Sequence, residues 1–139
     1  MQSPQRPGDL VTIDPDECVR LLDEAPWVRI GFVVDGAPSV LPINVLLHDE
    51  AIFFRTAAGS KLGTAASAGA VAIQADGGDE SARVGWSVVA NGTASIVTDP
   101  AVEEALLARP FEPWALPDDA RFWVRVDVDS VSGRRIVRP

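Results

Sequence analysis

Apolar and polar residues alternate with a period of two along most of this chain, which is the pattern of β-strands that bury one face. The alternation begins near Trp27 and is broken by short clusters of glycine, proline and acidic residues, which predict turns. Because such short turns join antiparallel neighbours, we expect an antiparallel meander. The predicted strands are 27–34, 39–47, 51–56, 70–76, 84–98, 121–129 and 131–137, with a turn between the last two.

Three short helices are expected among the strands. Asp14 and Pro15 open the first one, as an N-cap acid and a proline at the first helical position, and Pro26 ends it. Its apolar residues follow the i, i+3, i+4, i+7 spacing of one buried face: Cys18, Leu21, Leu22 and Ala25. The other segments are a helix over 59–69, a helix capped by Asp99 that runs to about Ala108, a loose arm over 1–12, a loop over 77–83 and an irregular connection over 109–119.

The strands and helices together predict a mainly β fold. A chain of 139 residues, 47% of them hydrophobic, is long enough for a single domain with one core, so we expect 1–139 to form one domain. An antiparallel barrel is expected, because closure removes exposed sheet edges. Pro42 cannot donate to a strand ladder, so its strand should lie at an edge, a bulge or a ligand-facing split, and Gly92 should bend the fifth strand.

The net charge of -8 argues against nucleic acids and anionic membranes as partners, since both attract positive charge. No stretch approaches the roughly 18 to 20 apolar residues of a membrane span. Residues 1–9 are polar and contain proline, unlike a signal peptide. We therefore expect a soluble, cytoplasmic protein that binds neither nucleic acid nor membrane.

Few residues could carry catalysis by themselves. Cys18 is the only cysteine, which excludes an intrachain disulfide, and its helical neighbours predict a buried, inert thiol. His48 is the only histidine, lies in a predicted hairpin turn and has no serine of the G-x-S-x-G type to accompany it. We expect neither a metal site nor catalytic side chains.

The stretch "FFRTAAGSKL", residues 53–62, is the strongest candidate for binding. A strand ends at Arg55 and Thr56, and Ser60 then caps a helix that begins near Lys61, the only lysine of the chain. Helix N-termini concentrate free N–H donors and the positive end of the dipole, so with two added cations this turn suits a phosphate group. On these residues alone, an ordinary helix cap with a surface arginine explains the pattern equally well.

Other strands could complete a cleft around that turn. Asn44 gives the apolar stretch "VLPIN" (40–44) a polar side chain, and "GWSVV" (85–89) and "FWVRV" (122–126) carry tryptophan or arginine. Each tryptophan could equally be a core or interface residue. A planar, partly polar ring with a phosphate tail would use all of these stretches together.

The ordered series "VLPIN", "IFFRTAAGSKL", "GWSVVANGTASIV" and "WVRVDVDSVSGRR" resembles the pyridoxamine 5'-phosphate oxidase-like split β-barrel family, specifically its small flavin-binding branch that includes nitroimidazole-resistance proteins. The likeness extends from about Asp16 to Arg135. It implies a homodimer with two FMN sites at the subunit interface and a small-molecule substrate. It also implies a role for each candidate residue: Leu41, Pro42, Ile43 and Asn44 along the flavin ring and ribityl chain, Arg55, Thr56, Ser60 and Lys61 on the phosphate, and Trp86, Ser87, Trp123 and Arg125 from the partner or the far wall.

The chain also departs from the true oxidases of the family, which carry an Arg-x-His segment near the C-terminus. This sequence ends "SGRRIVRP", with no histidine after residue 48, so oxidation of pyridoxamine phosphate is not expected. The resemblance implies an FMN-binding oxidoreductase in which the cofactor does the chemistry. An F420-dependent reductase, a haem-binding protein and a scaffold without a cofactor are the alternatives.

Overall fold

The computed structural model describes residues 6–57, 59–114 and 122–139, so residues 115–119 of the predicted connection and Arg121 lie outside the described residues. The fold is mainly β with short helices, as predicted. The elements of the described residues are β1 Asp9–Thr12, α1 Pro15–Glu24, β2 Val28–Val34, β3 Ala37–Ile43, β4 Leu46–His48, β5 Ala51–Thr56, α2 Lys61–Ala68, β6 Ala70–Asp79, β7 Val84–Ile96, α3 Pro100–Leu107 and β8 Phe122–Val137.

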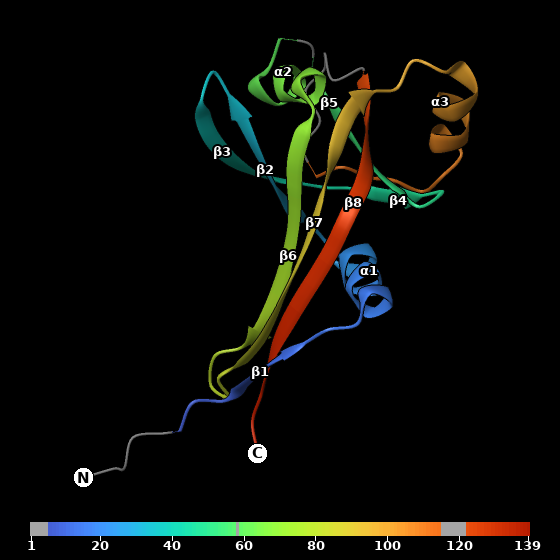
Figure 1. Cartoon of the computed structure of the whole chain (residues 1–139). Helices are drawn as coiled ribbons and strands as arrows, with labels where there is room; N and C mark the ends of the chain where they lie inside the picture. Colours follow the sequence, from blue (N-terminus) through green and yellow to red (C-terminus); the bar gives the residue numbers. More distant parts are fainter. Residues whose placement is uncertain (1–5, 58, 115–121) are drawn as a thin grey trace.

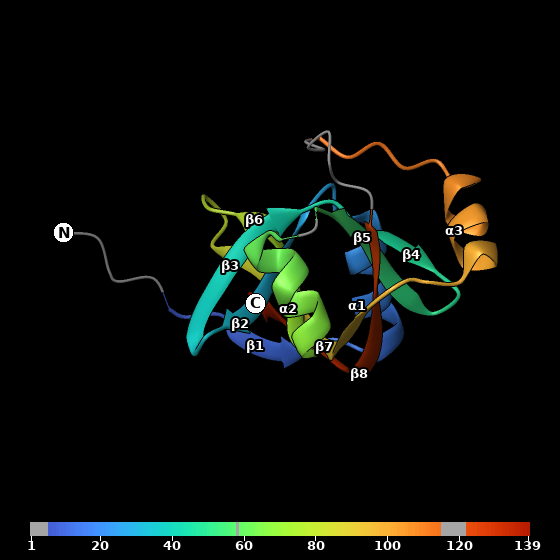
Figure 2. The same ribbon diagram turned by 90° about the horizontal axis from the view of Figure 1, so that it is seen from above.

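All the strands belong to one antiparallel sheet with the order β3-β2-β6-β7-β8-β5-β4, and β1 pairs with β8. The sheet curls, so that β3 and β4, which follow each other in the chain, form its two ends. Figure 1 shows β6, β7 and β8 as long strands that extend below the curled part. In Figure 2, viewed from above, α2 lies across the upper end of the curl.

β8 is one continuous strand, so the predicted turn between 121–129 and 131–137 is wrong. Val128 pairs with Gly92 and Ser130 with Asn91, so a register shift at Asp129 stands where the turn was predicted. Gly133 lies inside this strand and has a steric role, because a Cβ there would lie 2.6 Å from a methyl group of Val88. Glycine is required at this position by close packing and not by a turn.

Two other predicted loops are partly wrong. Residues 77–79 extend β6 into the hairpin with β7, and a Cβ on Gly77 would lie 2.8 Å from the indole nitrogen of Trp86. The arm expected over 1–12 includes β1, because residues 9–12 pair with β8. The predicted irregularity at Gly92 is confirmed, since the register between β7 and β8 shifts between Asn91 and Gly92.

The strand predicted over 39–47 is divided into β3 and β4. Its break comes at Asn44, whose side chain bonds to other segments, as described below. The turn before β3 is Asp35-Gly36, where both residues have positive φ, as a two-residue hairpin turn requires. β3 ends the strand order, which confirms the expectation that Pro42 lies on an edge strand.

The helices begin and end close to their predicted bounds. Asp99 caps α3 by accepting a 2.9 Å hydrogen bond from the N–H of Ala101. Asp14 precedes α1 but makes no side-chain cap, a difference from the prediction. Of the predicted buried face of α1, Cys18 and Leu22 are fully buried while Leu21 and Ala25 are partly buried.

β5 separates two hydrophobic clusters. Ile52 and Phe54 face the main core inside the curled sheet, which α1 and α2 help to close. Phe53 faces the other way, into a smaller cluster with Leu106 of α3 and Trp123 of β8. Since β5 is buried on both faces, its last two residues, Arg55 and Thr56, are held in a rigid position.

Candidate functional site

The turn between β5 and α2 is held by a network of hydroxyl contacts. Ser60 Oγ donates to the carbonyl of Ala57 (2.8 Å) and accepts from the N–H of Gly63 (2.9 Å), which makes Ser60 the N-cap of α2. The buried Thr56 hydroxyl lies 3.1 Å from Ser60 Oγ. A Cβ on Gly63 would lie 2.6 Å from the Ala57 oxygen, so glycine permits the tight turn. Thr56 and Ser60 therefore shape the turn.

Two backbone donors remain at the start of α2. The first N–H groups of a helix have no intrahelical partner, and the Ser60 cap satisfies only that of Gly63. Among the described residues, the N–H groups of Lys61 and Leu62 have no hydrogen-bond partner. Lys61 is exposed, and its ammonium group makes no ion pair within the described chain. This helix end can thus offer two N–H groups and one full charge to an anion.

Arg55 leaves β5 just before this turn and lies between a ring and a cavity. Its guanidinium carbon is 5.4 Å from the ring centre of Trp123, its register partner on β8. Such stacking holds the charge in place. Its Nε is buried without a hydrogen-bond partner in the described part of the chain. Buried donors are nearly always paired in native proteins, so this unpaired nitrogen makes Arg55 a candidate binding residue.

Arg55 also lines a cavity of about 330 Å³ that we call the aromatic cavity. This volume lies at the lower end of the range of ligand pockets, roughly 300 to 1,000 Å³. The cavity is built from the end of β3 and the connection after α3. Its lining residues are Trp27, Pro42, Ile43, Asn44, Arg55, Phe111, Pro113 and Trp114.

Asn44 joins the segments around the aromatic cavity. Its Nδ2 donates to the carbonyl of Pro26 (3.0 Å), and its Oδ1 accepts from the backbone N–H of Trp114 (2.7 Å). The rings of Trp27 and Trp114 are 5.2 Å apart at 55°. Phe111 packs on Trp123 at 5.3 Å, so the connection is fixed to the barrel at two points.

The structure thus brings together a subset of the predicted site residues. Pro42, Ile43, Asn44 and Arg55 share the aromatic cavity, and Thr56, Ser60 and Lys61 lie at the adjoining turn. The remaining residues lie elsewhere in the protomer, as follows. Leu41 is exposed on the edge strand, and Trp123 is buried behind Arg55. Arg125 forms an ion pair with Asp127, and Ser87 accepts a hydrogen bond from Gln74. Trp86 lines an adjacent cavity of about 250 Å³, which shares Trp27 with the aromatic cavity.

The sequence interpretation missed the aromatic wall formed by Trp27, Phe111 and Trp114. Trp27 was assigned to a strand, and the other two lie in a connection without periodicity. A signal existed in "FEPWALP" (111–117), where two aromatic residues lie among prolines in a connection, since binding residues are often carried by loops.

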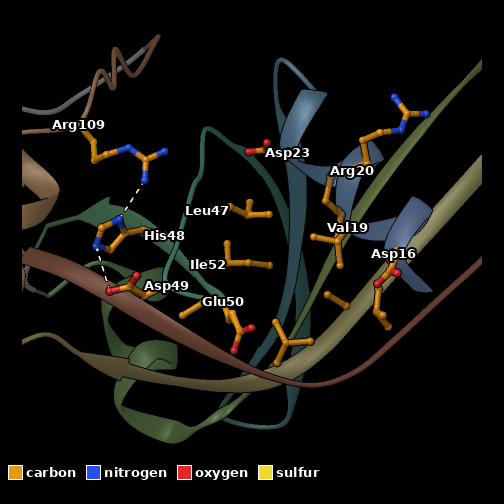
Figure 3. Close-up of a pocket in the computed structure, with 15 residues that line it drawn as sticks. Asp16, Val19, Arg20, Asp23, Leu47, His48, Asp49, Glu50, Ile52 and Arg109 are labelled. Carbon is orange, nitrogen blue, oxygen red and sulfur yellow. Dashed lines mark hydrogen bonds and ion pairs between the residues drawn. The ribbon is translucent and has the colours of Figure 1, made fainter. Parts of the chain in front are cut away.

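A second and larger cavity, of about 980 Å³, lies between α1 and the β4–β5 hairpin, and we call it the large cavity. Figure 3 shows Asp16, Val19 and Arg20 on one side and the chain of Arg109, His48 and Asp49 on the other. Its floor is apolar, including Leu47 and Ile52. None of the predicted site residues lines it.

The charges of this large cavity disfavour a phosphate-bearing ligand. Four carboxylates line it, against two guanidinium groups. Arg20 is neutralised by Glu17 and Glu24, whose hydrogen bonds raise the pKa of its guanidinium above the usual range. Arg109 contacts His48 Nδ1 at 2.9 Å. Because a guanidinium can only donate, Nδ1 must accept, which leaves Nε2 protonated toward Asp49.

Other kinds of site find little support. In the described residues, no group of three or more His, Cys, Asp or Glu side chains is placed to hold a metal ion. Cys18 is confirmed as buried, and burial raises the pKa of its thiol, which makes the thiolate scarce. No helix in the described ranges is long and apolar enough to cross a membrane.

Known proteins resemble the chain over nearly its full length. The uncharacterized protein Rv0080 of Mycobacterium tuberculosis is 35% identical, with 97% of this chain and 91% of that protein covered. The structure of the FAD binding protein from Mycobacterium smegmatis superposes with a TM-score of 0.79 at 32% identity, covering 93% of this chain and 100% of that one. A FAD-binding protein from Mesorhizobium loti has the same fold, with a TM-score of 0.75 at 22% identity over 92% and 99% of the two chains.

These neighbours are split β-barrels, so the curled sheet has the predicted fold. The family model described as pyridoxamine 5'-phosphate oxidase matches residues 14–135, which include every strand from β2 to β7, all three helices and most of β8. The chain therefore belongs to the pyridoxamine 5'-phosphate oxidase family.

Proposed function

We propose that this protein is a flavin-binding oxidoreductase that passes electrons or a hydride to a small acceptor. The bound flavin would supply the redox chemistry, and the protein would bind and orient it. In the proposal the phosphate group lies at the start of α2, and the ring and ribityl chain lie along Leu41, Pro42, Ile43 and Asn44. FMN is the flavin that we propose; FAD is the alternative, since the Mycobacterium smegmatis relative is an FAD binding protein.

The observation that carries the proposal is the state of Arg55. Its Nε is buried without a partner among the described residues, while its guanidinium is held on Trp123. A few residues later, α2 begins with the N–H groups of Lys61 and Leu62, which have no hydrogen-bond partner among the described residues. A phosphate group there would accept from the two N–H groups and would be attracted by the Arg55 guanidinium, and its hydrogen bonds would be strengthened by charge.

We further propose that the protein works as a homodimer with two cofactor sites at the subunit interface. The support is that Trp86, Ser87 and Arg125 do not reach the aromatic cavity of their own protomer. These side chains would serve the site of the partner. A sedimentation experiment that finds only monomer would contradict this part of the proposal.

Titration with FMN tests the central claim. Purified protein should be yellow and should bind added FMN, and Arg55→Met should weaken binding about 10- to 100-fold, the value of one hydrogen bond to a charged group. Arg109→Met is the matched control, because Arg109 belongs to the large cavity and its loss should change affinity less than about twofold. If Arg109→Met weakened FMN binding and Arg55→Met did not, the binding site would be the large cavity.

Parallel titrations with FAD, F420 and haem separate the alternatives. Preference for F420 would indicate an F420-dependent reductase, and preference for haem a haem protein. If the protein bound none of these cofactors, the remaining alternative would be a scaffold without a cofactor. Oxidation of pyridoxamine phosphate is not proposed, since the chain has no histidine after residue 48.

A further inference from the structure

The connection from Arg109 to Trp114 has no regular secondary structure, yet tertiary contacts fix it beside the aromatic cavity. At its start Phe111 packs on Trp123, and at its end the N–H of Trp114 donates to Asn44 across 70 positions of sequence. The contact with Trp27 then places the indole of Trp114 at the cavity wall. A loop held in this way presents its side chain in a defined position.

Most of the Trp114 side chain is nevertheless uncovered, with 68% of the residue exposed. Trp27 beside it is 43% exposed. Two adjoining indoles that remain in water form an apolar surface of the kind that marks binding sites. Ordinary packing does not explain why the chain anchors a large ring here and leaves it exposed.

Asn44 is occupied by the protein itself. One end of its amide bonds to Pro26 and the other to Trp114, so its best-placed donor and acceptor are both used. The amide keeps a second N–H and a second lone pair, but the two bonds that it makes join Pro26 to Trp114. Its evident effect is to set the position of Trp114 relative to β3.

We propose that Trp114 stacks on the isoalloxazine ring of the bound flavin, and that Asn44 is a positioning residue that acts on the ring through Trp114. This inference rests on the proposed function. Pro42 and Ile43 supply the wall formed by β3 in the same cavity, and Arg55 leads from it toward the phosphate turn. A planar ring placed there meets an electron-rich indole, and offset stacking of such rings is favourable.

Fluorescence of the bound flavin tests the stacking. A stacked indole quenches an excited flavin by giving it one electron, which then returns to the indole. Trp114→Leu should therefore raise the fluorescence of the saturated complex severalfold and raise the Kd about two- to tenfold. The comparison is made also in a Trp27→Leu background, so that the neighbouring indole cannot hide the change.

Leu107→Ala is the matched control, because Leu107 is equally exposed at 68% but does not line the aromatic cavity. It should leave fluorescence and Kd as they are in the wild type. Unchanged fluorescence of Trp114→Leu in both backgrounds would overturn the stacking, even if its Kd rises.

A double-variant cycle tests the role of Asn44. Asn44→Ala should raise flavin fluorescence, since Trp114 loses its anchor, and the pair Asn44→Ala with Trp114→Leu should be no brighter and bind no more weakly than Trp114→Leu alone. Additive effects on the Kd would show that Asn44 contacts flavin directly and would overturn its positioning role. If the wild type binds no flavin, the proposed function itself fails; if it binds flavin and these variants behave as the wild type, only this inference fails.

Discussion

Replacing Ser60 by alanine separates the stability of α2 from its role in binding. The variant loses the acceptor of the Gly63 N–H and the partner of the buried Thr56 hydroxyl. Loss of an N-cap costs about 1 kcal/mol, within a range of roughly 0.5 to 2 kcal/mol. Unfolding in urea, followed by circular dichroism, should show this decrease in the free energy of unfolding.

In Ser60→Ala the loss of free energy of flavin binding should exceed the loss of free energy of unfolding. Without its cap the first turn of α2 frays, so the N–H groups of Lys61 and Leu62 lose their fixed direction. A charge-assisted hydrogen bond is worth about 1.5 to 3 kcal/mol, and the Kd measured by titration should therefore rise about 10- to 100-fold.

Asp99→Ala supplies the comparison. Asp99 caps α3, which has eight residues like α2, through the same kind of side-chain hydrogen bond. Its removal should cost a similar free energy of unfolding, about 1 kcal/mol, and change the Kd for flavin less than about twofold. Equal losses of affinity in the two variants would refute the assignment of the phosphate to the start of α2.

Three further predictions concern the supporting structure. Gly63→Ala should lower the free energy of unfolding by about 1 to 3 kcal/mol in urea titrations, because its Cβ would meet the Ala57 oxygen at 2.6 Å. Leu106→Ala should cost about 2 to 5 kcal/mol by the same measurement, since it empties the centre of the small cluster beside Trp123. Burial raises the pKa of Cys18, so the folded state holds this proton more tightly and stability should fall as pH rises above about 8.5. Cys18→Ala should flatten that slope, and an unchanged slope would show that other groups cause it.

Local patterns predicted the elements whose signals are contained within a few residues. β5 has its predicted bounds, and the starts of α2 and α3 follow from Ser60 and from Asp99-Pro100. The order of these elements, together with the resemblance, was enough for the fold. At both helix starts, the residue that predicts the N-cap in the sequence also makes the capping hydrogen bond in the structure.

Gly77 misled the prediction, because the reason for a glycine at this position is distant in sequence. It was assigned to a loop, but it lies inside β6 and makes room for Trp86, as Gly133 inside β8 makes room for Val88. A single sequence does not distinguish a glycine that bends the backbone from one that admits a side chain.

The site was predicted only where it is local. The turn from Thr56 to Ser60 spans four residues, and its hydroxyl pair follows from the strand-to-helix junction. Trp114 reaches the cavity through a bond to Asn44, 70 positions away. A hydrophobic period or a motif spacing does not predict this contact, because it depends on how the curled sheet brings the end of β3 beside the segment that follows α3.

The edge strand β3 has a consequence for the behaviour of the protein in concentrated solution. Pro38 and Pro42 cannot donate to β2, so their missing N–H groups belong to the row that faces away from it, and the period of two places Val40 in the same row. Val40 is thus the only donor among these three positions. A strand from another molecule would meet few N–H donors along this edge of β3. The shortage of donors protects a β-rich chain from forming fibrils through β3.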